Sequence, residues 1–158
     1  MVDGKALVQD YLREVFSEGR IDRIPAYLRG ETFIAGVVEL VTRWRTAFPD
    51  FHENVEEVYA DGDKVITVSE LTGTHRGVLD SRVGPIEPTG RSVRWSRIAI
   101  RRLDGDRFVA GHWEEDDIGL LQQLGVLGNG ETVEPGLPSP LARPPERAAP
   151  NDGEETSR

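Results

Sequence analysis

Residues 52–75 read HENVEEVYADGDKVITVSELTGTH. β-Branched residues recur on both sides of the triplet Asp61-Gly62-Asp63, valine before it and valine, isoleucine and threonine after it, and an Asp-Gly pair is a frequent turn between adjacent antiparallel strands. The same turn chemistry returns at Asp104-Gly105-Asp106. We therefore predict two hairpins, built from strands at 52–60 and 64–75 and at 91–103 and 106–115.

The segment between the two hairpins, residues 77–90, is rich in glycine and proline. These residues favour turns and interrupt regular strands. We predict that this segment is a long connection at one end of the sheet, without strand structure of its own.

Three helical patterns precede the strands. Behind a candidate N-cap at Asp3, apolar residues recur at three- and four-residue spacing until Gly19, which predicts one amphipathic helix. A short second helix is predicted over residues 21–28. A third apolar face runs over residues 37–48 and is stopped by Pro49, because the residue before a proline disfavours helical geometry.

A fourth helix is predicted at residues 118–124, behind the acidic pair Asp116-Asp117. Aspartate is a favoured N-cap, and its charge complements the positive end of the helix dipole. Helices followed by a strongly bent antiparallel sheet form an α+β architecture. We expect the concave side of that sheet to enclose a pocket.

Composition limits the function of the 158-residue chain, which carries 19 Lys and Arg against 28 Asp and Glu, a net charge of −9. A surface of this sign repels nucleic acid. The absence of cysteine excludes disulfides, thiolate metal sites and a cysteine nucleophile. Since neither a signal-peptide pattern nor an 18-residue apolar run occurs, we expect a cytoplasmic protein that does not enter a membrane.

The composition changes near Gly130, and six of the ten prolines lie beyond it. A stretch of this kind has too few apolar residues to offset the entropy lost on ordering its backbone. We predict one domain over residues 1–129 and a flexible, proline-rich tail over residues 130–158.

Five ordered segments together resemble the SnoaL-like polyketide cyclase family, within the nuclear-transport-factor-2-like superfamily. They span about residues 5–126, most of the predicted domain. The segments are Arg43-x4-Phe48-Pro49-Asp50; Val58-Tyr59-Ala60-Asp61-Gly62-Asp63-Lys64-Val65; Leu71-Thr72-Gly73-Thr74-His75-Arg76-Gly77; Pro88-Thr89-Gly90-Arg91; and His112-Trp113 through Asp116 to Leu120-Leu121-Gln122-Gln123-Leu124-Gly125.

The resemblance implies a cone-shaped α+β barrel with a mostly apolar cavity, in a homodimer or homotetramer. It also implies an enzyme that closes the last ring of an aromatic polyketide methyl ester by intramolecular aldol reaction, without a metal or organic cofactor. The acid/base of the family is an aspartate before the last helix. Counting back from Gly119 places it at Asp116, and counting forward from Trp113 places it at Asp117. We prefer Asp116, because a bulge at the end of the strand can absorb one residue.

Two histidines are candidates to assist this chemistry, because a neutral imidazole offers one donor and one acceptor. His75 ends the second predicted strand and His112 lies on the last one. Strand alternation places His112 opposite Trp113, unless a bulge resets it. Either histidine has an alternative structural role at the rim, and one of the two aspartates has an alternative role as a helix cap.

Flat apolar side chains suit a polycyclic aromatic ligand, although packing in the core is the alternative for each of them. Alternation also places Trp95 and Arg97 on one face, where Arg97 would bind a carboxylate, phenolate or enolate if that face is concave. The candidate substrate-binding residues are Tyr11, Trp44, Phe48, Trp95, Arg97 and Trp113.

Other functions remain open within the same superfamily, because fold alone does not choose among them. One is a hydroxylase partner or epoxide-opening enzyme of a polyketide pathway, and another is a non-catalytic ligand-binding protein. No metal site is expected, because no two histidines are spaced to present two ligands from one element.

Overall fold

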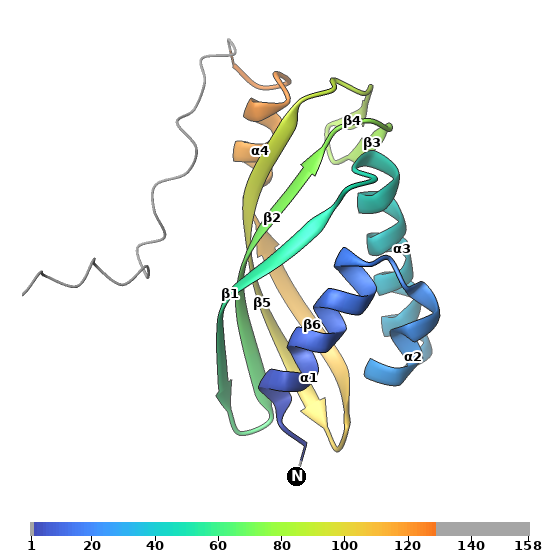
Figure 1. The fold of residues 1–158 in the computed structure, drawn as a ribbon, viewed down its shortest axis with the longest axis vertical. Helices are drawn as coiled ribbons and strands as arrows, with labels where there is room; N and C mark the ends of the chain where they lie inside the picture. Colours follow the sequence, from blue (N-terminus) through green and yellow to red (C-terminus); the bar gives the residue numbers. More distant parts are fainter. Residues whose placement is uncertain (1, 129–158) are drawn as a thin grey trace, which may run out of the picture.

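The predicted order, helices first and strands afterwards, is confirmed in the computed structural model, which describes residues 2–128 (Figure 1). The tail predicted at residues 130–158 lies outside the described residues. In the described part of the chain, a four-stranded antiparallel sheet carries the order β1-β2-β5-β6. A separate pair, β3 and β4, stands at one end of it.

The first helical segment begins at Asp3, whose carboxylate accepts from the backbone N–H of Lys5 at 2.9 Å and caps α1 (Gly4–Tyr11). The chain continues as a π-helical stretch, η1 (Leu12–Ser17), before it turns at Gly19, so the predicted segment is present but not uniformly α-helical. The helix predicted over residues 21–28 is also divided into two short pieces, a 3₁₀ turn η2 (Ile21–Arg23) and α2 (Ile24–Tyr27), and Leu28 instead forms an isolated bridge with Phe108.

The long helix α3 (Glu31–Ala47) begins six residues earlier than the predicted apolar face. Phe33 stands one helical turn before Val37 and continues the same face, which explains the longer helix. None of the helices within residues 2–128 combines the length and apolarity needed to cross a membrane.

The four main strands follow the predicted boundaries to within one residue. They are β1 (His52–Asp61), β2 (Lys64–Thr74), β5 (Ser92–Asp104) and β6 (Arg107–Glu115). Gly62 and Gly105 have φ of 58° and 65°, the left-handed conformation that the two tight turns require. Both predicted hairpins are therefore confirmed.

The prediction that residues 77–90 hold no strand is wrong. Two short strands, β3 (Leu79–Ser81) and β4 (Gly84–Ile86), pair with each other in this connection. The Ser81 hydroxyl donates to the Gly84 carbonyl at 2.6 Å and closes their turn. Leu79 and Ile86 face each other in this pair and are both buried, so apolar packing overrides the turn-prone composition.

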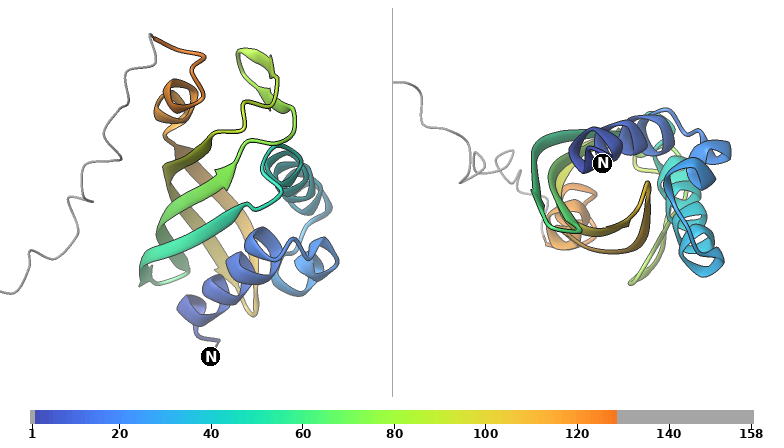
Figure 2. Two further views of the ribbon diagram at one scale, coloured as in Figure 1. Left: turned by 45° about the horizontal axis from the view of Figure 1, so that its top comes forward. Right: turned by 90° about the horizontal axis from the view of Figure 1, so that it is seen from below.

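The sheet curls around the helices, and α1 and α3 lie along its open side (Figure 2). Every second residue of β2 and β5 is buried on the inner face. At one end of this interior, Trp44, Phe48, Phe51 and Trp95 form an aromatic cluster in which the Trp44 and Trp95 rings lie 5.2 Å apart. The predicted α+β cone is confirmed.

The last helix, α4 (Asp117–Gln123), follows β6 directly and packs on β5. The backbone carbonyl of Arg94 on β5 accepts from the Gln123 side chain at 2.7 Å, and the Gln123 amide oxygen accepts from the Arg94 N–H at 3.0 Å. This double contact fixes the helix against the sheet.

Replacing Gly77 by alanine is predicted to destabilise the fold, because its Cβ would stand 2.0 Å from the backbone oxygen of Thr46 at the end of α3. Overpacking against rigid backbone costs about 1–3 kcal/mol. The measurement is urea unfolding of Gly77→Ala.

The matched control is Gly36→Ala within α3, where a Cβ meets nothing within 4 Å. That change is expected to stabilise the protein by about 0.5–1 kcal/mol, since alanine favours a helix over glycine. Equal effects of the two substitutions would contradict the close approach at Gly77.

Candidate functional site

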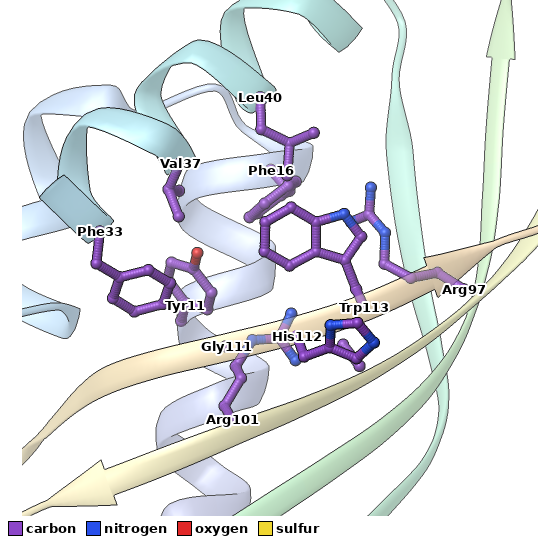
Figure 3. A pocket seen from close by; sticks show the side chains of 11 residues that line it. Tyr11, Phe16, Phe33, Val37, Leu40, Arg97, Arg101, Gly111, His112 and Trp113 are labelled. Atoms are coloured by element: carbon purple, nitrogen blue, oxygen red, sulfur yellow. The ribbon is translucent and has the colours of Figure 1, made fainter. Parts of the chain in front are cut away.

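A small pocket, with free space for about one water molecule, lies between the helices and the inner face of β5 and β6 (Figure 3). One wall is apolar and comes from the helical layer. It consists of Phe16 of η1 and three residues of α3: Phe33, Val37 and Leu40. Their spacing on α3 follows one helical face, so a single amphipathic stripe supplies most of this wall.

The opposite side of the pocket is aromatic and cationic. It is formed by Tyr11 of α1, Arg97 and Arg101 of β5, and Trp113 of β6. Three of the predicted substrate-binding residues, Tyr11, Arg97 and Trp113, are thus brought together. Gly111 pairs with Arg101 across the sheet, and the Phe33 ring packs against it, because a Cβ at this position would lie only 3.2 Å from Phe33 Cζ.

Arg97 is a buried cation held between two buried carboxylates. Its Nη1 donates to Glu53 Oε2 at 2.8 Å, and its Nη2 and Nε donate to Glu115 Oε1 at 2.8 and 3.1 Å. The Arg97 and Glu53 side chains are 1% and 0% exposed. Charges removed from water in this way require such partners, so we call Glu53, Arg97 and Glu115 the ion triad.

Strand register explains how the ion triad assembles. Arg97 stands directly opposite Glu115 in the β5–β6 ladder and opposite Ser69 in the β2–β5 ladder. Glu53 reaches the triad from β1, on the far side of β2. Because residues on one face of a sheet recur every second position, the triad forms a row across the inner face.

Arg101 stands two positions beyond Ala99 and four beyond Arg97 on the same inner face. Its Nη1 donates to the Thr67 hydroxyl at 2.9 Å, and its Cζ lies 5.6 Å from the centre of the Tyr11 ring. Burial lowers the pKa of Arg101, and the nearby Tyr11 and Glu53 oppose that change. A guanidinium nevertheless stays protonated in proteins.

Tyr11 of α1 is buried in the pocket lining, with 2% of its surface exposed. Burial raises the pKa of Tyr11 far above its ordinary value, an effect that Arg101 partly offsets. The phenol therefore stays protonated and can donate a hydrogen bond.

The structure places the two predicted acid/base residues outside the pocket lining. Asp116 is the N-cap of α4, and its Oδ1 accepts from the Gly119 N–H at 2.9 Å. Asp117 begins the helix, and both side chains are exposed. The alternative role as a helix cap is thus filled by Asp116.

The bulge expected between Trp113 and Asp116 is absent. The β5–β6 ladder runs in register from the Arg97–Glu115 pair to the Arg102–Ala110 pair, and its irregularity comes after Arg102. Alternation therefore turns Trp113 and Glu115 inward. The strand end needs no bulge, because Glu115 is held on the inner face by Arg97 and by the Trp95 indole N–H at 3.3 Å.

The same alternation turns the His112 side chain outward. It is 74% exposed and lies 3.2 Å from Glu114, although the residue borders the pocket at the strand. His112 and Trp113 are thus on opposite faces, as the alternation predicts without a bulge.

His75 is fully buried but lies beside the aromatic cluster, away from the pocket lining. Its ring is 5.3 Å from the Phe48 ring, and its Nδ1 accepts from the Thr89 N–H at 3.2 Å. This contact ties the end of β2 to the segment before β5. Burial lowers the pKa of His75, so the folded protein keeps the imidazole neutral.

Trp44, Phe48 and Trp95 also lie in the aromatic cluster and do not line the pocket. These three residues pack in the hydrophobic core, which was the alternative interpretation of their sequence pattern. Their rings support the end of the sheet that carries Glu115, because the Trp95 indole binds that carboxylate.

Arg101, Glu53 and Glu115 are interior residues that were not predicted from the sequence. The alternation that placed Trp95 and Arg97 on one face extends to Arg101 and would have found it. Glu53 and Glu115 gave no such signal, because a charged residue at a strand end is usually solvated.

Among residues 2–128, no group of three or more His, Asp or Glu side chains is arranged to hold a metal ion. The side chains that meet in the pocket include hydrogen-bond donors: a phenol, an indole and the Arg101 guanidinium, since Arg97 donates to Glu53 and Glu115.

The family model described as SnoaL-like polyketide cyclase matches residues 6–124. The match covers nearly all of the domain that builds the pocket. The chain therefore belongs to the SnoaL-like polyketide cyclase family. A comparison with curated protein sequences finds no match.

Solved structures show the same fold. TsrD from Streptomyces laurentii superposes with a TM-score of 0.68 at 22% identity, over 80% of this chain and 100% of TsrD. A candidate polyketide cyclase from Acidithiobacillus ferrooxidans gives 0.65 at 27% identity, over 79% of this chain and 97% of that one. AclR, a candidate hydroxylase from Streptomyces galilaeus, superposes with a TM-score of 0.65 at 24% identity, over 79% of this chain and 86% of AclR.

Arg97→Met is predicted to destabilise the protein strongly, because it leaves Glu53 and Glu115 buried without their cation. Removing one partner of a buried ion pair costs about 3–5 kcal/mol. Urea unfolding of the variant measures this loss.

Arg94→Met is the matched control on the same strand. The Arg94–Glu70 pair spans 3.3 Å with the Arg94 side chain 54% exposed, so its removal should cost less than about 1 kcal/mol. If the two variants lose equal stability, the ion triad does not hold the sheet together.

Stability is predicted to fall as the pH is lowered, in part because of His75. Its pKa in the folded protein lies below the ordinary value of 6.5, so below that pH the unfolded chain binds a proton that the folded protein resists. The loss begins near pH 6.5 and continues down to the folded pKa. The measurement is the free energy of unfolding from pH 8 to pH 5, in wild type and in His75→Gln.

All other titrating groups are common to the two proteins, so the difference between their pH profiles isolates His75. A smaller decline in His75→Gln is expected. Identical profiles would show that His75 binds its proton equally in both states.

Proposed function

We propose that this protein closes a ring of a polyketide-derived aromatic substrate by intramolecular aldol addition, without an organic cofactor or metal. Family membership supports the substrate class. The observation that carries the chemistry is the pocket itself, where the neutral Tyr11 hydroxyl and the Arg101 guanidinium stand opposite an apolar wall. Donors in a largely dry site stabilise the negative oxygen that forms when a carbon acid loses its proton.

The proposed step conserves all atoms of the substrate. A carboxylate base removes the proton between two carbonyl groups, and the resulting enolate carbon forms a bond to a ketone carbon. The ketone oxygen becomes an alkoxide and takes a proton back from the same carboxyl group. A hydrogen-bond donor at either oxygen lowers the barrier of its step.

We propose Asp116 or Asp117 as that carboxylate, on the strength of the resemblance. Both stand at the end of β6, just beyond Glu115, and neither lines the pocket. For either to act, the substrate must extend from the pocket past Trp113 to the start of α4. Glu115 is the inward carboxylate of the same run, and it accepts two hydrogen bonds from Arg97, one from Nε and one from Nη2.

A second candidate function is ligand binding without catalysis. It is favoured by one observation, namely that no carboxylate among the described residues lines the pocket. The hydroxylase-partner and epoxide-opening alternatives stay predictions, and dependence on oxygen or on a reductant would identify them. The predicted homodimer or homotetramer also stays a prediction.

The test is conversion of an anthraquinone-type polyketide, offered as methyl ester and as free acid, by purified protein in EDTA without added cofactor. Cyclised product is expected with wild type. Loss of a catalytic base lowers the rate by about 10²–10⁴-fold, so Asp116→Asn or Asp117→Asn should show such a loss, and the responsive variant identifies the base.

Asp22→Asn, at an exposed aspartate in η2, is the matched control and should keep the full rate. The rate of Glu115→Gln tests whether turnover needs the inward carboxylate of Glu115 rather than one of the two exposed aspartates. Saturable binding of the substrate without turnover in wild type would overturn ring closure and support the binding role.

A further inference from the structure

We propose that Gln123 is a positioning residue for the carboxylate of Asp116. Gln123 is the last residue of α4, and Asp116 is the N-cap of the same helix. The inference rests on the proposed function in taking Asp116, one of the two proposed bases, as the one that acts. It rests on the contacts between α4 and β5 for the role of Gln123.

Strand β5 extends beyond the end of its neighbour β6. The β5–β6 ladder ends at the Arg97–Glu115 pair, whereas β5 begins at Ser92. The chain that leads into α4 continues along this edge of β5, since the backbone N–H of Asp116 donates to the Ser96 carbonyl at 3.1 Å. The start of α4 is therefore tied directly to β5.

The Gln123 side chain binds β5 as a residue of a neighbouring strand would. Its amide oxygen accepts from the Arg94 N–H at 3.0 Å, and its amide nitrogen donates to the Arg94 carbonyl at 2.7 Å. Paired residues of antiparallel strands exchange the same two hydrogen bonds. The Arg91 guanidinium adds a contact by donating to the Gln123 backbone carbonyl at 2.9 Å. The end of α4 is thus fixed on β5 as well.

The same amide reaches back to the turn of α4 that binds the Asp116 carboxylate. Gln123 Nε2 also donates to the Gly119 carbonyl at 3.0 Å, and the Gly119 N–H donates to Asp116 Oδ1 at 2.9 Å. Gly119 lies directly against this carboxylate, because a Cβ at that position would collide with it. A continuous series of contacts therefore runs from the β5 backbone through Gln123 and Gly119 to Asp116.

This series of contacts matters because Asp116 has little else to hold it. Within residues 2–128, the hydrogen bond from Gly119 is the one that its carboxylate makes with the protein. Exposed side chains change rotamer freely, whereas a general base must stand within hydrogen-bond reach of the proton that it removes. Misplacing a reacting group by about 1 Å can cost about 10²-fold in rate. Gln123 therefore sets the place from which Asp116 meets the substrate.

The test is a double-mutant cycle with the anthraquinone-type polyketide methyl ester as the probe. Gln123→Met keeps the size of the side chain and removes its amide. It should lower kcat by about 10- to 100-fold with little change in KM, since it alters the placement of the base rather than the binding of the substrate. In an Asp116→Asn background it should have no further effect, because the residue through which it acts is already changed.

Gln122→Met is the matched control, at the exposed neighbour on the same helix. It should keep the wild-type kcat. Circular dichroism at the assay temperature checks that each variant is folded, so that a lower kcat does not reflect a smaller folded fraction.

A second measurement does not depend on turnover. Hydrogen exchange of the Gly119 N–H in the full chain should be about tenfold faster in Gln123→Met than in wild type, because the turn beneath Asp116 loses its contact with β5. The rate in Gln122→Met should equal that of wild type.

Unchanged Gly119 exchange or a retained kcat in Gln123→Met would overturn the proposal. An equal loss of kcat with Asp116 and with Asn at that position would also overturn it, because a merely structural role gives that result. An inactive wild type would overturn ring closure instead, and the exchange rate then decides whether Gln123 positions Asp116. If Gln123→Met fails to fold, Gln123→Asn, which is shorter by one methylene, answers the same questions.

Discussion

The fold depends on one buried arginine. Arg97 stands between Glu53 of β1 and Glu115 of β6, so a single side chain connects strands that are separated in the sheet. A charge inside a protein is tolerated only when its donors are satisfied, and here all three donor nitrogens are. The inward direction of Glu115, the position of Asp116 as the cap of α4, and the outward direction of His112 follow from this contact and from the alternation of β6.

The ion triad also explains why the pocket has its chemical character. Because Glu53 and Glu115 turn toward Arg97, they leave Arg101 without an anion in the described chain, next to a phenol that burial keeps protonated. The helical layer covers these groups with apolar side chains and reduces their contact with water. The interior of this member of the SnoaL-like polyketide cyclase family thus joins hydrogen-bond donors to an apolar wall.

The candidate site was only partly predictable from the sequence. Alternation placed Trp95 and Arg97 on one inner face, and both are buried there. The same rule could not show that Trp95 would pack against Trp44 and bind Glu115, because those contacts join residues far apart in the chain. Asp116 was predicted both as an acid/base and as a cap. The cap is a local hydrogen bond between Asp116 and Gly119, three positions apart in the chain, and the structure shows this role.

The sequence by itself determined the order of elements, the two Asp-Gly hairpins, the cap of the last helix and the family. These follow from local turn chemistry, periodicity and short motifs, which depend on residues close together in the chain. Only the tertiary structure decided the short pair β3–β4, the ion triad and the isolation of Arg101 from any carboxylate in residues 2–128. Each of these depends on which side chains meet across the curled sheet, and that meeting is fixed by strand register and by the packing of α1 and α3.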